Sequence, residues 1–295
     1  MAFSLFAIKE EKIKEQYLIA STGDVRIYDK QEKALNKLAS YGKDAAIYLI
    51  GQFDRTNVRR IRTIEKGLIM IGDDAVEPLL AKLSSGNPKH AVLAAKILGE
   101  IGDDRALLSL MMASRGQSPA LRAKACYALG EIREKEALDN LLLALDDSVA
   151  SVRRSAAIAA GKIGDSKALD KLIEKLYDND YSVRYSASYA IISIGDTNIV
   201  PELEKRLAND TTMTKYHIIE TIGQIGAESS RENLLSLTES PNHLTRGFAY
   251  KALSNYRGIY EIANTIKKGM DDNSTFVRQM SEEALYRIAE PPEEN

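Results

Sequence analysis

A short motif recurs along the chain at a nearly constant spacing, and this periodicity constrains the fold more than any other feature. The motif is a hydrophobic residue followed by glycine and often by aspartate, as in Ile101-Gly102-Asp103. Successive positions lie 30 to 32 residues apart, and Arg133 divides the one double step of 62 residues between copies of the glycine motif. The nine positions of the series are Gly42, Gly72, Gly102, Arg133, Gly164, Gly195, Gly226, Arg257 and Ala289. A repeat of this length predicts a stack of small, similar structural units.

Each repeat predicts two helices. Residues 152–163 place apolar side chains on one helical face, formed by Val152, Ala156, Ala159, Ala160 and Ile163. Gly164 suits the left-handed residue that ends a helix, and residues 168–176 then repeat leucine at helical spacing. Pro78 and Pro201 each stand six residues past a motif glycine, which predicts the first turn of this second helix. One such pair cannot bury its apolar face alone, so neighbouring pairs must stack.

Composition agrees with helix and excludes few functions. The 295 residues are 44% hydrophobic and 28% charged, with 7 prolines and no tryptophan. A formal net charge of −2 gives no global attraction to nucleic acid or anionic membranes. A single cysteine excludes an internal disulfide framework, which fits a reducing compartment and predicts a cytoplasmic protein.

The two ends differ from the repeats. Residues 1–8 are apolar, but they lack a basic leader and run into the charged residues 9–12. The apolar stretch is too short for a membrane span or an ordinary signal peptide. We expect residues 1–29 to form a capping helix and loop, residues 30–290 the repeat array, and residues 291–295 an acidic tail.

Three stretches follow one consensus: an acidic residue, a short turn, Val-Arg, then Ala-Ala-x-Ala-Leu-Gly-x-Ile-Gly-Asp. They are residues 118–132, 147–165 and 178–196. They resemble the HEAT-like repeats first named for phycobilisome lyases, and the resemblance extends over roughly residues 30–290. It implies an all-α protein, a right-handed α-solenoid (an α–α superhelix) of about nine helix pairs. Because these repeats serve many roles, the resemblance implies a fold and no single function.

A basic residue recurs in register with the repeat, at Arg122, Arg153, Arg184, Lys215, Arg246 and Arg278. Six residues before each of them stand Gly116, Asp147, Asp178, Asn209, Ser240 and Asp272. One interpretation is a basic stripe that binds a ligand. The favoured interpretation is structural: the acidic residue of each turn bonds the arginine of the same or the next repeat.

Residues typical of catalysis are scarce. Some HEAT-like hydroxylases bind two irons through His-Glu pairs, but His90, His217 and His243 are each followed by another residue. Cys126 aligns with Ala157, which predicts a small buried side chain. Nucleotide loops, nucleophile elbows and zinc-ligand spacings are also missing from the sequence. We therefore expect a protein that is no enzyme and uses no cofactor or metal.

In HEAT solenoids the Val-Arg helix generally lines the concave side, so its side chains outside the core predict the contents of a groove. The N-terminal half of this predicted groove is rich in lysine, and its later part carries tyrosine and phenylalanine, which are frequent in binding hot spots. The predicted partner-binding residues are Lys66, Lys96, Lys124, Tyr127, Arg154, Tyr185, Tyr189, Tyr216 and Phe248.

Three functions remain open from the sequence. The first is a non-enzymatic scaffold or adaptor that binds a partner protein in its concave groove. The second, implied by the resemblance, is a bilin-lyase-like helper or cofactor-handling chaperone that acts on a client protein. The third is nucleic-acid binding through the basic N-terminal half, which includes Arg55, Arg59, Arg60, Arg62 and Lys66. The oligomeric state stays open.

Overall fold

The computed structural model describes residues 2–22, 26, 28–54, 57–256 and 258–289, with side chains from residue 9 onward. These residues form α-helices and short 3-10 turns, and no strand. The helices are α1 Ala2–Ala20, α2 Tyr28–Ala39, α3 Lys43–Ile50, α4 Val58–Ile71, α5 Asp73–Leu83, α6 Pro88–Ile101, α7 Leu107–Ala113, α8 Pro119–Ile132, α9 Leu138–Ala144, α10 Ala150–Ile163, α11 Leu169–Lys175, α12 Tyr181–Ile194, α13 Val200–Asn209, α14 Thr214–Ile225, α15 Arg231–Leu237, α16 His243–Leu253, α17 Tyr260–Lys268 and α18 Thr275–Ala289. The expected all-α fold is confirmed.

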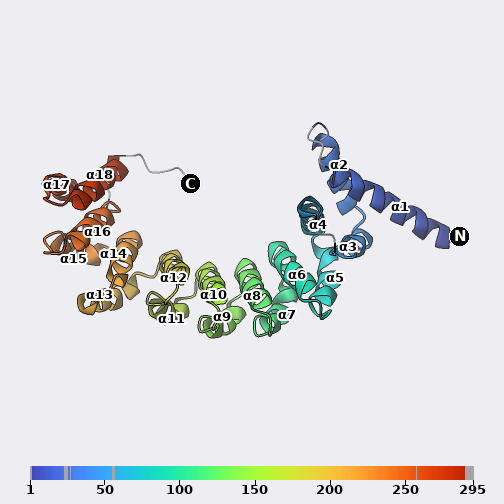
Figure 1. Ribbon diagram of the computed structural model, residues 1–295, viewed down its shortest axis with the longest axis horizontal. Helices are drawn as coiled ribbons and strands as arrows, with labels where there is room; N and C mark the ends of the chain where they lie inside the picture. Colours follow the sequence, from blue (N-terminus) through green and yellow to red (C-terminus); the bar gives the residue numbers. More distant parts are fainter. Residues whose placement is uncertain (1, 23–25, 27, 55–56, 257, 290–295) are drawn as a thin grey trace. The chain divides into compact units, whose positions relative to one another are not determined.

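The chain forms two compact units, residues 1–159 (unit 1) and residues 160–295 (unit 2). In unit 1, α2, α4, α6 and α8 pack side by side in one layer, while α1, α3 and α5 pack in another (Figure 1). In unit 2, α12, α14, α16 and α18 form the corresponding layer, each packed against the odd-numbered helix that precedes it. The even-numbered helices are the Val-Arg helices of the sequence pattern, and we call their solvent-exposed side the even-helix face.

The recurring motif marks the ends of the even-numbered helices, as the sequence predicts. Helix α6 ends at Ile101, and Gly102 takes the left-handed conformation with φ of 75°. Arg133 holds the same position after α8 with φ of 62°, although its side chain makes this conformation costly. Helix α16 instead ends at Leu253, before the Arg257 position, which lies outside the described residues.

The first two repeats connect their helices more tightly than the others. Gly72 has φ of 64° and ψ of −120°, a region that only glycine enters easily, and α5 begins at once with Asp73. Pro78 therefore lies inside α5, which corrects the prediction that it stands in the first turn. Pro201 does occupy the first turn of α13, because a 3-10 turn, residues 197–199, separates Gly195 from this helix.

Small residues allow the even-numbered helices to pack closely within each unit. A Cβ atom added to Gly99 on α6 would lie 2.5 Å from Cα of Ala128 on α8. The same pairing recurs between Gly223 and Ala252, where the added atom would lie 2.5 Å from the alanine Cβ. Since real Cβ contacts are longer, glycine is required wherever this backbone approach occurs.

Helix α1 packs against α2 and α3 at the start of unit 1. Ile13, Tyr17 and Ala20 are buried there, and the Tyr17 ring meets the Tyr48 ring edge-on at 5.8 Å between centroids. This arrangement supports the proposal that residues 1–29 cap the repeat array. The proposed acidic tail, residues 291–295, lies outside the described residues.

Candidate partner-binding surface

Three exposed tyrosines stand on one side of α12, and we call them the tyrosine stripe. Tyr181, Tyr185 and Tyr189 follow one another at four-residue steps, which places them on the same helical face. The stripe is exposed because Val183 and Ala187 occupy the opposite, buried face of the helix. The tyrosine side chains are 59%, 59% and 58% exposed.

The stripe has a defined arrangement of rings. The Tyr181 and Tyr185 rings are stacked with centroids 6.4 Å apart, and Tyr181 also meets the His217 ring of α14 at 5.7 Å. The Arg184 guanidinium lies 5.5 Å from the centroid of the Tyr181 ring. His217 is half-buried, and this burial lowers the pKa of its imidazole. Sequence reasoning selected Tyr185 and Tyr189 but missed Tyr181, which the four-residue spacing alone would have found.

Tyr216 differs from the expectation of an exposed groove residue, and Phe248 is half-buried. Tyr216 is only 6% exposed, since its ring stacks on Phe248 at 5.0 Å between centroids and with 21° between the planes. Phe248 in turn meets Phe276 of α18 at 5.6 Å. These rings pack α14, α16 and α18 together. Tyr216 is therefore buried within the helix packing and offers little exposed contact surface.

Glutamates pair with Lys96, one of the predicted lysines of unit 1, and the repeat alignment did not reveal this. The Lys96 ammonium lies 2.8 Å from a carboxylate oxygen of Glu65 and 3.8 Å from one of Glu100. Lys124 lies over the Tyr127 ring, 5.0 Å from its centroid. Partial burial, with a smaller contribution from the hydrogen bond to Glu131, raises the pKa of Tyr127 to about 12. This part of the face is therefore of mixed charge.

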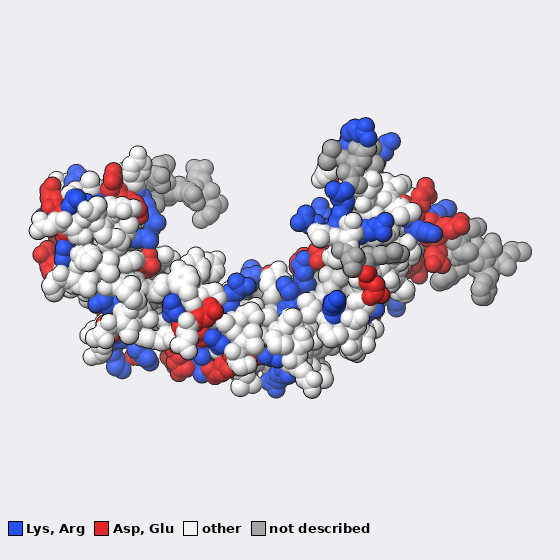
Figure 2. Space-filling model, viewed as in Figure 1, with Lys and Arg blue, Asp and Glu red and all other residues white. Residues whose placement is uncertain are grey.

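Two other predicted residues of unit 1 are exposed. Arg154 projects into solvent from α10, and Lys66 from α4. Lys66 also lines a pocket between α2 and α4, together with Arg59 and Arg62. Figure 2 shows lysine and arginine side chains gathered where α2 and α4 lie in Figure 1.

The recurring arginines form hydrogen bonds between and within repeats, and we call this set the arginine ladder. Nε and Nη2 of Arg122 donate to the two carboxylate oxygens of Asp147 at 2.6 and 2.8 Å. Nη1 of Arg122 donates to the carbonyl of Gly116 at 3.0 Å. One arginine thus joins α8 to the turn that precedes α10, which confirms the structural interpretation.

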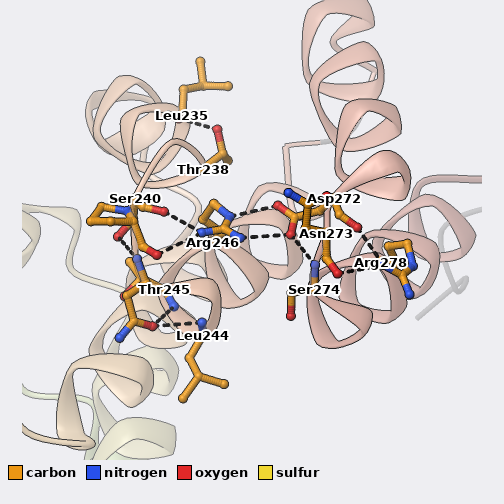
Figure 3. Close-up of polar contacts among 12 residues, drawn as sticks. Leu235, Thr238, Ser240, Leu244, Thr245, Arg246, Asp272, Asn273, Ser274 and Arg278 are labelled. Atoms are coloured by element: carbon orange, nitrogen blue, oxygen red, sulfur yellow. Dashed lines mark hydrogen bonds and ion pairs between the residues drawn. The ribbon is translucent and has the colours of Figure 1, made fainter.

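Unit 2 contains the same arrangement (Figure 3). Arg246 donates to both carboxylate oxygens of Asp272, at 2.8 and 2.9 Å, and Nη1 donates to the carbonyl of Ser240. Nη1 of Arg278 donates to the Asp272 carbonyl at 2.7 Å. Arg153 and Arg184 likewise contact the aspartates six residues before them, but in each case through the backbone carbonyl.

Cys126 is fully buried on α8, as its alignment with Ala157 predicts, and burial raises the pKa of its thiol to about 12. We expect a disulfide reagent such as dithionitrobenzoate to react with native protein at neutral pH at least about a hundredfold more slowly than with protein in urea, because the thiolate is the nucleophile. Absorbance of the released thiolate measures both rates. Equal rates would contradict a buried thiol.

The described residues contain no group of three or more histidine, cysteine or acidic side chains that could hold a metal ion. None of the helices they form combines the length and the apolar character of a membrane-spanning segment.

Comparison with known proteins gives one family match and several more distant similarities. The family described as HEAT repeats matches residues 76–160, 107–192 and 200–286. The phycocyanobilin lyase subunit beta of Thermosynechococcus vestitus is 35% identical over 95 residues, which are 32% of this chain and 45% of that protein. The match thus spans less than half the length of this relative.

Two solved structures are also similar. Human deoxyhypusine hydroxylase in complex with glycerol has 20% sequence identity and a TM-score of 0.38, over 85% of this chain and 96% of that one. An engineered protein has 18% identity and a TM-score of 0.43, over 94% of this chain and 89% of the other.

Proposed function

The chain belongs to the HEAT-repeat family, and from this premise we propose that it is a non-enzymatic scaffold that binds a partner protein on its even-helix face. The observation that carries the proposal is the tyrosine stripe. Three large aromatic side chains, each more than half exposed, lie together on one helix. Contiguous exposed apolar groups of this kind mark interaction sites, whereas single ones are ordinary on any surface.

Tyrosine suits this role for a physical reason. Its ring contributes a large contact area, its hydroxyl stays hydrogen-bonded to water or to the partner, and only two side-chain torsions are fixed on binding. The stacking of Tyr181 on Tyr185 already restricts both rings in the free protein. A partner that covers the stripe would therefore lose less conformational entropy than one that orders free side chains.

The remaining predicted contacts extend the proposed surface within each unit. In unit 1, Lys66, Lys96, Lys124, Tyr127 and Arg154 lie on even-numbered helices, and Lys96 forms ion pairs with glutamates. In unit 2, Tyr216 is buried and stacks on Phe248, which is half-buried. The concave groove and the cytoplasmic location expected from the sequence stay predictions.

The stripe is tested by replacing Tyr185 and Tyr189 together with serine. Random peptides displayed on phage are selected on the full chain, and their affinities are measured by fluorescence anisotropy. We expect one class of the selected peptides to bind the double variant at least about thirtyfold more weakly, equivalent to about 2 kcal/mol for hot-spot tyrosines.

The matched control is Tyr260→Ser, which removes an isolated tyrosine that is 81% exposed on α17. This variant should bind the selected peptides as the parent does. Circular dichroism establishes that all variants remain helical. If every selected peptide bound the double variant and the parent equally, the binding surface would lie elsewhere and the proposal would fail.

A second candidate function follows from the similarity to the phycocyanobilin lyase subunit. We propose as an alternative that the chain assists the attachment of a bilin to a client protein. Titration of the full chain with phycocyanobilin tests this directly, with a shift in the visible absorption spectrum as the expected result. An unchanged spectrum at micromolar protein would remove the support for this alternative.

A further inference from the structure

An open pocket of about 460 Å³ lies between α2 and α4 in unit 1. Leu35, Ile69 and Met70 contribute apolar surface to it, and Met70 is 44% exposed. Tyr28, at 61% exposed, is the aromatic side chain among the described lining residues. The pocket is large enough for one or two apolar side chains of another molecule.

Three cations line the same pocket: Arg59, Arg62 and Lys66, all from α4 and all exposed. Among the described residues, no carboxylate forms an ion pair with any of the three. Glu32 is the acidic residue of the lining. Lys96, one repeat further along, is instead neutralised by Glu65 and Glu100. The pocket therefore presents net positive charge beside apolar surface.

The position of these arginines in α4 is itself unfavourable. Arg59 stands in the first turn of the helix, where the partial positive charge of the backbone N–H groups disfavours cations, and Arg62 follows in the second turn. The first turn contains no acidic residue, and the side chain of Asn57 caps the end. Unfavourable placements of charge such as this one are expected at functional sites, since a bound anion would offset the repulsion between the cations and the helix N-terminus.

We infer that this pocket binds an acidic segment of a partner protein, which inserts an apolar side chain against Leu35, Ile69 and Met70 and places its carboxylates on Arg59, Arg62 and Lys66. The inference rests on the proposed function only in taking the occupant to be a protein. A nucleic acid fits less well, because its backbone needs a continuous track of free cations and stacking platforms, whereas the next lysine, Lys96, is already paired.

The test uses the phage selection on the full chain, with Arg62→Glu as the variant and Lys135→Glu as its control. Lys135 is exposed in unit 1 outside the pocket, and both substitutions change the net charge equally. We expect a class of selected peptides with acidic residues next to an apolar one. Their affinity should fall about tenfold or more in Arg62→Glu, change little in Lys135→Glu, and weaken with added salt.

A second variant tests the apolar part of the pocket independently. Met70→Ser removes exposed apolar surface without changing the charge, and we expect it to weaken the same peptides about fivefold while leaving the salt dependence unaltered. The inference would be overturned if no class of the selected peptides combined acidic residues with weaker binding to Arg62→Glu. So would a single-stranded oligonucleotide of deoxythymidines that displaces the peptides from the parent but fails to bind Arg62→Glu.

The two proposals fail separately in these measurements. If all selected peptides lost affinity for the Tyr185 and Tyr189 double variant and none was affected by Arg62→Glu, the proposed function would stand and the pocket inference would fail. If all were acidic and sensitive to Arg62→Glu alone, the pocket would be established and the tyrosine stripe would fail as a binding site.

Discussion

Replacing Gly99 by leucine is expected to lower the free energy of unfolding by about 3 kcal/mol, because the new side chain has no room between α6 and α8. Even a Cβ atom would lie 2.5 Å from Cα of Ala128 and 2.7 Å from its Cβ. The helices must therefore separate, and the neighbouring core residues Leu98 and Leu129 lose contacts. Urea denaturation followed by circular dichroism measures the change.

Glu100→Leu is the matched control, since it places the same side chain on the next residue of α6, where Glu100 is exposed. This variant should have an unfolding midpoint close to that of the parent. Equal unfolding midpoints for Gly99→Leu and the parent would mean that α6 and α8 do not approach as closely as described.

Asp147→Asn is expected to cost about 2 kcal/mol of stability, because it leaves the Arg122 guanidinium largely buried without its charged partner. The two side chains are 14% and 12% exposed. Asparagine can still accept from the backbone N–H of Val149, as Asp147 does at 2.9 Å, so the turn keeps its cap. The same urea experiment measures the loss. Glu202→Gln, which breaks an exposed pair with Arg206, should have little effect.

The pH dependence gives an independent check of the ladder. Hydrogen bonding to Arg122 holds the pKa of Asp147 below its ordinary value, and Arg246 does the same for Asp272. A carboxylate with a lowered folded-state pKa contributes its full stabilisation above the unfolded value of about 3.9, and loses it as the pH falls through the folded value. Stability should therefore drop below about pH 4, and less steeply in Asp147→Asn. Parallel profiles for variant and parent would exclude this pair as a source of the acid sensitivity.

The sequence correctly predicted several features that depend on position within the repeat. The helix ends at Gly102 and Gly164 and the burial of Cys126 follow from register, because equivalent residues occupy equivalent environments. The structural role of the arginines was also predicted, but the carboxylate of Asp147 bonds Arg122 of the preceding repeat. Pro78 was misplaced because Gly72 adopts a different backbone conformation from Gly195, and the motif residues Ile-Gly-Asp are the same at both positions.

The surface was harder to predict, since it depends on contacts between side chains of different repeats. Tyr216 occupies the repeat position of the exposed Tyr185, yet its ring stacks on Phe248 of α16, the next even-numbered helix. Lys96 occupies the same repeat position as Lys66, but it forms an ion pair with Glu65 of the preceding repeat. Comparing residues at one position of the repeat does not reveal such neighbours, because they lie at other positions of the repeat.

One interface between even-numbered helices has consequences for how the chain unfolds. Ile192 stands at the repeat position of Gly161 and Gly223, so α12 and α14 lack the close glycine–alanine contact described above. These two helices instead share a hydrogen bond of 2.7 Å between the hydroxyls of Ser188 and Thr221. Among the described residues, Arg184 has carbonyls of its own turn as its hydrogen-bond acceptors and reaches no carboxylate of the next repeat. In a linear array, each repeat is held by its immediate neighbours. Amide hydrogens of α12 and α14 should then exchange through partial opening at this interface, at a lower free energy than those of α16. The helix that carries the tyrosine stripe would thus be able to detach from its neighbour while the rest of the array stays folded.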